Sequence, residues 1–346
     1  MELKGIYEKL ILAKRPIDFF GEISNEIDLK KKYRNYAKEV HPDYFGKDDE
    51  YIAKEATSKL NELYDLAVKE FKKGIYNVVD PLELFKHSDP LFEIDIAGNI
   101  HKFYEHVFSG DIANVFKGEC EGKITYLKIA RDSQDNELID NEFQILSKIK
   151  HQSLPFIKNK IMINDTLAIT TEEVEGIPVT QFMKDFKRGI PSEHVMWMLE
   201  RVLSVTGYLH SNFIVHGNIK PENIIINKKN HNVSLLGFAF SIQEANSENT
   251  KYKFKNEHYS APEVRKDMKV LPSSDIYSIG KIAITLLGGD VEKCAMPITV
   301  HSDIRNFIRK LIVQDYNKRP NDAWQLWDEL REIRSKVFGN ERFKTF

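Results

Sequence analysis

The chain has 346 residues, of which 42% are hydrophobic and 29% are charged, and this mixture excludes a wholly disordered or collagen-like protein. A net charge of −2 argues against a globally basic protein that binds nucleic acid or anionic membranes, and the only cysteines, Cys120 and Cys294, suggest neither a disulfide framework nor a metal site. The sequence lacks a signal-peptide pattern and the run of about 18 apolar residues that a membrane helix needs, so we expect a cytoplasmic protein.

Residues 1–78 show helical periodicity and no strand pattern. Apolar residues recur at helical spacing from 28 to 40, and three basic residues, Lys31, Arg34 and Lys38, fall on the opposite face. His41-Pro42-Asp43 follows directly, and because proline disfavours helix at the preceding residue, we expect this triplet in a loop. A second apolar stripe from Ala56 to Phe71 predicts a second helix that pairs with the first as an antiparallel hairpin.

This pattern resembles the J domain of DnaJ-type co-chaperones. The matching segments are Leu29-Lys-Lys-Lys-Tyr33-Arg34, His41-Pro42-Asp43 and Leu60-Asn61-Glu62-Leu63-Tyr64. The resemblance implies that the basic helix and the loop dock on a DnaK-type chaperone and stimulate its ATP hydrolysis, and a basic face would steer toward an acidic partner. The alternative reading is a turn of common residues after a solvated helix face. The first helix, near Ile6 to Leu12, matches poorly.

Residues 79–101 contain Asp80-Pro81, Ser88-Asp89-Pro90 and Gly98, which are turn and breaker signals, so we expect an irregular linker there. Three runs then alternate like strands, and they cover residues 103–108, 113–119 and 124–130. Amphipathic helices dominate from there to the C-terminus. Strands followed by helices predict an α+β domain of two lobes.

Two charged residues occupy apolar faces in this second region. Lys128 shares a strand face with Ile124, Tyr126 and Ala130, and Glu142 lies on the apolar stripe of a helix predicted over residues 136–149. A charge on an apolar face needs a partner. The two side chains would satisfy one another if the helix packs on the strand, although either could instead extend to water.

A series of later segments resembles the eukaryotic-type protein kinase fold, over about residues 102–336. The segments, in chain order, are Leu209-His210, Phe213-Ile-Val-His216-Gly-Asn218-Ile-Lys220-Pro-Glu-Asn223, Val233-Ser-Leu-Leu-Gly237-Phe238-Ala239, Ser260-Ala261-Pro262-Glu263, Ser274-Asp275 and Lys318-Arg319-Pro320.

The resemblance assigns roles to individual residues. Lys128 matches the lysine that holds the α/β phosphates of ATP, with Glu142 as its helix partner, and Lys220 matches the catalytic-loop lysine near the γ-phosphate. Asn223 matches a metal ligand. The segment Glu172-Glu173-Val174 matches the hinge that contacts adenine through its backbone, with Thr171 before it at the gatekeeper position. The residues whose implied role is structural are Asp275, Glu263 and Arg319.

Two aspartates that phosphoryl transfer uses are missing. Asn218 stands at the catalytic-base position, and an amide does not accept a proton near neutral pH. Gly237 stands where the family places a metal-binding aspartate, and Mg²⁺ requires oxygen ligands that glycine lacks. The phosphate loop from Phe108 to Val115 keeps one of three expected glycines, Gly110, and Asp111 adds negative charge.

We therefore expect a multi-domain chain: an all-α J-domain hairpin (1–78), a linker (79–101) and an α+β bilobal kinase-like domain (102–338), with an N-lobe to about 174 and a C-lobe from about 175. The expected function is a co-chaperone that stimulates a DnaK-type chaperone, with a pseudokinase scaffold that binds an unknown client or senses nucleotide. ATP binding stays open, Mg²⁺ is doubtful, and no cofactor is required. The alternative is an atypically active Ser/Thr protein kinase or another ATP-dependent transferase. Neither nucleic acid nor membrane is expected as a partner.

Overall fold

The computed structural model describes residues 3–78, 80–228, 232–243 and 258–339, so residue 79, the first of the expected linker, lies outside the described residues. The chain divides into two compact units. One comprises residues 1–94 with 102–104 and 119–123, and the other comprises residues 95–101, 105–118 and 124–346. Within the described part of the chain, no helix is long and apolar enough to cross a membrane.

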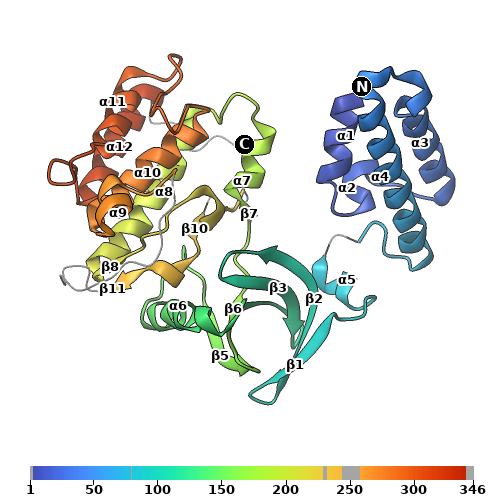
Figure 1. Ribbon diagram of the computed structural model, residues 1–346, viewed down its shortest axis with the longest axis horizontal. Coiled ribbons are helices and arrows are strands. Elements are labelled where there is room, and N and C mark those ends of the chain that lie inside the picture. Colours follow the sequence, from blue (N-terminus) through green and yellow to red (C-terminus); the bar gives the residue numbers. More distant parts are fainter. Residues whose placement is uncertain (1–2, 79, 229–231, 244–257, 340–346) are drawn as a thin grey trace. The chain divides into compact units, whose positions relative to one another are not determined.

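The N-terminal part of the first unit is helical (Figure 1). Its elements are α1 (Leu3–Leu12), α2 (Pro16–Phe20), α3 (Glu26–Glu39), the 3₁₀ turn η1 (Pro42–Tyr44) and α4 (Lys47–Lys72). Their apolar faces form one core, in which Ile6, Leu10, Leu29 and Leu60 are fully buried. The expected two helices and the intervening loop are therefore present, with two shorter helices before them.

The connection between the helices and the sheet is more ordered than the expected irregular linker. It contains α5 (Pro81–Phe85), which is capped by Asp80, and the strand β1 (Phe92–Ile96). Apolar residues at 92, 94 and 96 alternate with two carboxylates, which is the strand pattern. Ala97 and Gly98 both have positive φ, 55° and 87°, and reverse the chain into β2 (Asn99–Ser109). The signals at Ser88-Asp89-Pro90 and Gly98 mark irregular or turn segments, whereas Asp80-Pro81 begins α5, and the strand β1 lies between Pro90 and Gly98.

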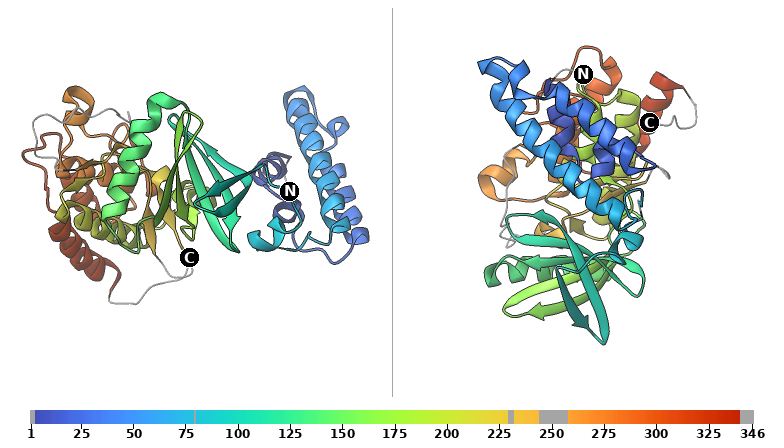
Figure 2. Two further views of the ribbon diagram at one scale, coloured as in Figure 1. Left: turned by 90° about the horizontal axis from the view of Figure 1, so that it is seen from below. Right: turned by 90° about the vertical axis from the view of Figure 1, so that its right-hand side faces the viewer.

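A six-stranded sheet with the order β1-β2-β3-β4-β6-β5 precedes the helix-rich region. The remaining strands are β3 (Ala113–Cys120), β4 (Lys123–Ala130), β5 (Ile157–Ile163) and β6 (Thr166–Glu172). The 3₁₀ turn η2 (Ser133–Asp135) leads into α6 (Asn136–Lys148), which lies against the sheet (Figure 2). Ile139 of α6 is buried in a core that it shares with the sheet. In the antiparallel pair β4–β6, Lys128 lies opposite Ile169 and Tyr126 lies opposite Thr171.

The chain leaves β6 through the segment 173–176 and enters a helix-rich region (Figure 1). Its helices are α7 (Val179–Phe182), α8 (Ser192–Ser211), α9 (Pro262–Asp267), α10 (Pro272–Leu286), α11 (Ser302–Leu311) and α12 (Ala323–Phe338). Its short strands and turns are β7 (Ile177–Pro178), η3 (Met183–Asp185), β8 (Ile214–Val215), η4 (Pro221–Asn223), β9 (Ile224–Ile226), β10 (Val233–Leu235), η5 (Phe238–Phe240) and β11 (Ile242–Gln243). Side chains of α8 and α10 form much of the large core, and the second unit has the expected bilobal α+β fold.

Candidate active site

Lys128 and Glu142 form an ion pair between the sheet and α6. The Nζ atom of Lys128 lies 2.5 Å from Oε2 of Glu142, and the two side chains are 21% and 7% exposed. Glu142 lies on the same buried face of α6 as Ile139, Ile145 and Leu146, so the packing of these apolar residues holds its carboxylate against the strand. The pairing of the two charges on apolar faces is thus present in the structure.

The loop after β8 is anchored by the buried carboxylate of Asp275 in α10. Its oxygens accept hydrogen bonds from the backbone N–H groups of His216 (2.8 Å) and Gly217 (2.9 Å), and one of them lies 3.0 Å from Nε2 of His210. Three donors converge on one carboxylate that is shielded from water, and such charge-assisted bonds are strong. This arrangement fixes the backbone that leads into Asn218.

The imidazole ring of His216 also holds this loop in place. Its Nδ1 accepts a hydrogen bond from the N–H of Asn218 (3.2 Å), so Nε2 carries the proton and donates to the carbonyl of Leu236 (3.1 Å). Burial lowers the pKa of His216, because the charged imidazolium would lose its hydration. The neutral ring therefore joins the loop to the segment that leads into Gly237.

Asn218 and Asn223, which belong to this loop, differ in the hydrogen bonds of their side chains. Nδ2 of Asn223 donates to the carbonyl of Asn218 at 2.8 Å. Asn218 is 8% exposed, and its Oδ1 has no hydrogen-bond partner among the described residues. A buried amide oxygen without a partner costs free energy, and a donor supplied by a substrate would remove that cost. Lys220, two residues after Asn218, is half-buried.

Gly237 has a backbone conformation that favours glycine. Its φ is +85°, and a Cβ added there would lie 2.6–2.8 Å from the side chain of Asn223. The following Phe238 is fully buried, and its ring lies 4.6 Å from that of His216. Asn141 of α6 donates to the carbonyls of Ala239 (3.0 Å) and Ser241 (2.9 Å). Packing and hydrogen bonds therefore fix this segment against α6 and the loop.

Replacing Gly237 with alanine should lower the free energy of unfolding by about 1–3 kcal/mol, because the new Cβ meets Asn223 at a strained φ. Gly122→Ala is the matched control: Gly122 has φ +73°, but nothing lies within 4 Å of its added Cβ. Urea unfolding of the full chain measures both variants. Equal losses in the two variants would contradict the close approach of Asn223.

The residues around Asn223 do not fit an ordinary magnesium site. Mg²⁺ is usually held by one or two carboxylates together with substrate phosphates. Gly237 offers no side-chain oxygen, the carboxylate of Glu142 is engaged by Lys128, and no cluster of three His, Cys, Asp or Glu side chains suited to a metal occurs in the described part of the chain. We therefore assign no catalytic step to a bound metal.

Hydrogen bonds at Gly110 hold the loop that was matched to the phosphate loop, residues 108–115, in place. Its N–H donates to the carbonyl of Ala113 (2.9 Å), and its own carbonyl accepts a hydrogen bond from Arg131 (3.3 Å). A Cβ on Gly110 would meet the ring of Phe108 at 2.7 Å. Asp111 is exposed. The loop is thus a tight hairpin in which one glycine permits the close approach of an aromatic ring.

The hinge segment carries two ion pairs. Glu172 pairs with Lys158 of β5 at 2.7 Å, and Glu173 pairs with Lys117 of β3 at 3.0 Å. Sequence reasoning did not identify Lys117 as part of the site, although its strand position was available. Asn141 was not identified either, because the sequence around a polar helix residue does not indicate which distant carbonyl groups its side chain will contact.

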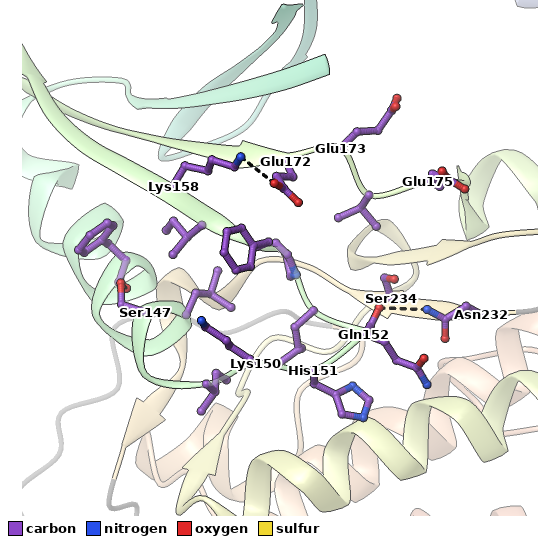
Figure 3. A pocket seen from close by; sticks show the side chains of 18 of the residues that line it. Ser147, Lys150, His151, Gln152, Lys158, Glu172, Glu173, Glu175, Asn232 and Ser234 are labelled. Carbon is purple, nitrogen blue, oxygen red and sulfur yellow. Dashed lines mark hydrogen bonds and ion pairs between the residues drawn. The ribbon is translucent and has the colours of Figure 1, made fainter. Parts of the chain in front are cut away.

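A cavity of about 850 Å³ lies beside the hinge, between the α6–β5 connection and the residues Asn232 and Ser234 (Figure 3). The hinge residues Glu172, Glu173 and Val174 line it, together with Lys150 and His151. Burial lowers the pKa of His151, whose Nδ1 accepts from the N–H of Ser153 (3.1 Å). Lys128, Asn218 and Asn223 do not line this cavity.

Glu263 and Arg319 form a buried pair within the helix-rich region. Nη1 and Nη2 of Arg319 lie 2.8 and 3.1 Å from the two carboxylate oxygens of Glu263, and both side chains are almost fully buried. The guanidinium also donates to the carbonyls of Val313, Ser273 and Gln314. Every partner belongs to the helix-rich region, so the pair joins elements of that region to one another.

The model of the protein kinase domain family matches residues 102–331. The chain belongs to this family. Over 205 residues the kinase domain is 24% identical to "Probable serine/threonine-protein kinase PknB" of Lactococcus lactis, covering 57% of the chain and 32% of that protein. It is 24% identical over 257 residues to human "Myosin light chain kinase family member 4", covering 71% of the chain and 64% of that protein. A serine/threonine-protein kinase of Clostridium perfringens, named as probable, is 25% identical over 259 residues, covering 68% of the chain and 38% of that protein. The chain thus spans less than two thirds of the length of these relatives.

These relatives overturn the expected function. We expected a co-chaperone with a pseudokinase scaffold, whereas two of these relatives are named serine/threonine-protein kinases, the third is named a myosin light chain kinase family member, and no J-domain family matches the N-terminal helices. The J-domain, DnaJ and co-chaperone descriptions are therefore wrong. No DnaK-type partner is assigned to Lys31, Arg34, Lys38 or the His41-Pro42-Asp43 triplet.

The structure of a short turn explains why the triplet His41-Pro42-Asp43 resembled a J-domain motif. His41 caps the turn η1, and its Nδ1 accepts from the N–H of Asp43 at 3.3 Å. Pro42 occupies the first position of the turn, where its missing N–H costs nothing, and Asp43 follows in the first turn. The motif thus satisfies the requirements of a short turn after a helix, which was the alternative reading of these residues.

Proposed function

We propose that this chain is an ATP-dependent serine/threonine protein kinase that transfers the γ-phosphoryl group without the two aspartates usual in this reaction. The observation that carries the proposal is the formed Lys128–Glu142 pair, at 2.5 Å, beside a catalytic loop that Asp275 anchors. We propose the boundaries 102–338 for the kinase domain, with the lobes meeting near residue 174, and a cytoplasmic location.

Each retained residue has a defined task in the proposed reaction. The ammonium group of Lys128, oriented by Glu142, would bind the α/β phosphates, and Lys220 would neutralise charge near the γ-phosphate. The hinge 172–174 would hydrogen-bond the adenine through backbone groups. The Oδ1 atom of Asn218, which has no partner among the described residues, would accept the hydrogen bond of a serine or threonine hydroxyl and orient it.

The reaction balances without a protein base. The hydroxyl oxygen forms a bond to the γ-phosphorus, the bond between that phosphorus and the bridging oxygen breaks, and ADP leaves. The hydroxyl proton passes to the transferred phosphate or to water, because an amide does not take it. A missing general base typically costs about 10²–10⁴ in rate, so we expect slow transfer.

Label transfer from γ-labelled ATP to the chain itself or to a serine-rich protein tests the proposal. Wild type should form labelled phosphoserine or phosphothreonine, and Lys128→Met should reduce the rate at least about 100-fold, because the phosphates lose their main cation. Lys123→Met is the matched control, since Lys123 is exposed on the same strand. α-Labelled ATP should give no label. Transfer that is absent in wild type, or unaffected by Lys128→Met, would refute the assignment.

A further inference from the structure

Three side chains from three segments meet near the hinge. Nζ of Lys117 on β3 lies 3.0 Å from a carboxylate oxygen of Glu173 and 5.6 Å from the ring centre of Tyr126 on β4. The Lys117 side chain is 13% exposed, and Tyr126 is half-buried. The Glu173 side chain is 35% exposed, so water weakens its ion pair with Lys117, whereas the cation–π contact joins the two more buried groups.

Strand geometry places this cluster between the phosphate end and the hinge end of the proposed nucleotide site. Residues 126 and 128 share one face of β4, because side chains two residues apart point the same way. The Lys128 side chain on that face meets Glu142. Tyr126 lies about 7 Å further along the strand, opposite Thr171, which immediately precedes the hinge. The phenol ring therefore stands on the line from the phosphate-binding lysine to the hinge.

The three groups reinforce one another electrostatically. Burial raises the pKa of the Tyr126 hydroxyl and Glu173 adds to the effect, whereas Lys117 lowers it, and the net direction is upward. The ring is therefore neutral at physiological pH and presents its face to a cation. Lys117 contacts both the ring and the carboxylate of Glu173, so it joins β3, β4 and the hinge.

We infer that Tyr126, Lys117 and Glu173 form a latch over the base-binding end of the site, so that the purine of ATP enters only when the Tyr126 ring turns away. The phosphate end, at Lys128, stays accessible with the latch closed. This inference rests on the proposed function, since it concerns the same nucleotide site. It makes Tyr126 a specificity-determining residue that weakens the binding of nucleotides and leaves the binding of base-free polyphosphates unaffected.

Calorimetric titration of the full chain with ATP, and separately with inorganic tripolyphosphate, tests the latch. Tyr126→Ala should tighten ATP binding about tenfold, as expected if the open site is about a tenth of the population. Its affinity for tripolyphosphate should not change. Tyr126→Phe keeps the ring but loses the hydroxyl next to Lys117, so it should tighten ATP binding less than Tyr126→Ala does. Lys117→Met should tighten ATP binding, whereas the exposed control Lys123→Met should not.

Three results would overturn the latch: unchanged or weaker ATP binding by Tyr126→Ala, an equal gain for tripolyphosphate, or no ATP binding by wild type and Tyr126→Ala alike. Thermal melting of each variant establishes that it is folded. The label-transfer assay separates the two proposals. Tighter ATP binding by Tyr126→Ala with no transfer would refute the kinase and keep the latch, whereas transfer with no gain in binding would do the reverse.

Discussion

Replacing Glu263 with glutamine should lower the free energy of unfolding of the chain by about 3–5 kcal/mol. The carboxylate binds Arg319 through both of its oxygens and also accepts a hydrogen bond from Ser274 Oγ (2.8 Å). Glutamine keeps one oxygen but presents an NH₂ group to the guanidinium. The charge of Arg319 then stays buried without its counter-ion, and this uncompensated charge is the main source of the loss.

The matched control is Glu329→Gln. Glu329 pairs with Lys310 at 2.5 Å, but this pair lies at the surface, with side chains that are 35% and 44% exposed. Exposed pairs contribute about 0–1 kcal/mol, because water and salt replace the lost partner. Urea unfolding at neutral pH compares the two variants. A loss in Glu263→Gln no larger than that in Glu329→Gln would show that the buried pair does not stabilise the helix-rich region.

Replacing Asp275 with asparagine should lower the free energy of unfolding by about 3 kcal/mol, since two or more charge-assisted hydrogen bonds weaken or disappear. Asparagine offers one acceptor oxygen where the carboxylate offers two, so a buried N–H of His216 or Gly217 loses its partner. The loop would then position Asn218 less well. We therefore expect label transfer to fall by at least about tenfold beyond the effect on stability.

Asp290→Asn is the control for this prediction. The Asp290 carboxylate also accepts two backbone N–H bonds, from Glu292 and Lys293 at 3.0 Å each, but it lies at the surface. Water can replace those bonds, so this variant should lose much less stability and keep its transfer rate. Denaturant unfolding and single-turnover label transfer, both with the full chain, provide the two readouts. Equal effects in the two variants would contradict the anchoring role of Asp275.

The kinase fold was predictable because its signals are numerous and independent. The segments around His216, Gly237, Glu263, Asp275 and Arg319 occur in one order with regular spacing. If one of these segments matched by chance, the matches of the other segments would still need an explanation. The alternation of β4 and the apolar stripe of α6 also predicted that Lys128 and Glu142 need each other, because a charge on an apolar face requires a partner.

The N-terminal assignment failed because it depended on a short motif. The helices and the loop at residues 41–43 are present, but a basic helix followed by three turn-forming residues is compatible with many proteins. Capping alone accounts for His41, Pro42 and Asp43. The expected inactivity of the kinase domain likewise depended on two substituted positions, and the names of its relatives favour the alternative of a working kinase.

By itself, the sequence determined the two-lobed α+β fold, the need of Lys128 and Glu142 for a partner, and the substitution of Asn218 and Gly237 for two aspartates of the family pattern. Only the tertiary structure decided that Asn218 Oδ1 is buried without a partner among the described residues, that Asn223 blocks a side chain at position 237, and that Lys117 joins Tyr126 to Glu173. Periodicity reports which face of an element is apolar, because burial repeats along one helix or strand. Contacts between residues more than 50 positions apart, such as Lys117 and Glu173, depend on how separate elements pack. The local sequence pattern around either residue does not indicate that they will lie close together in space.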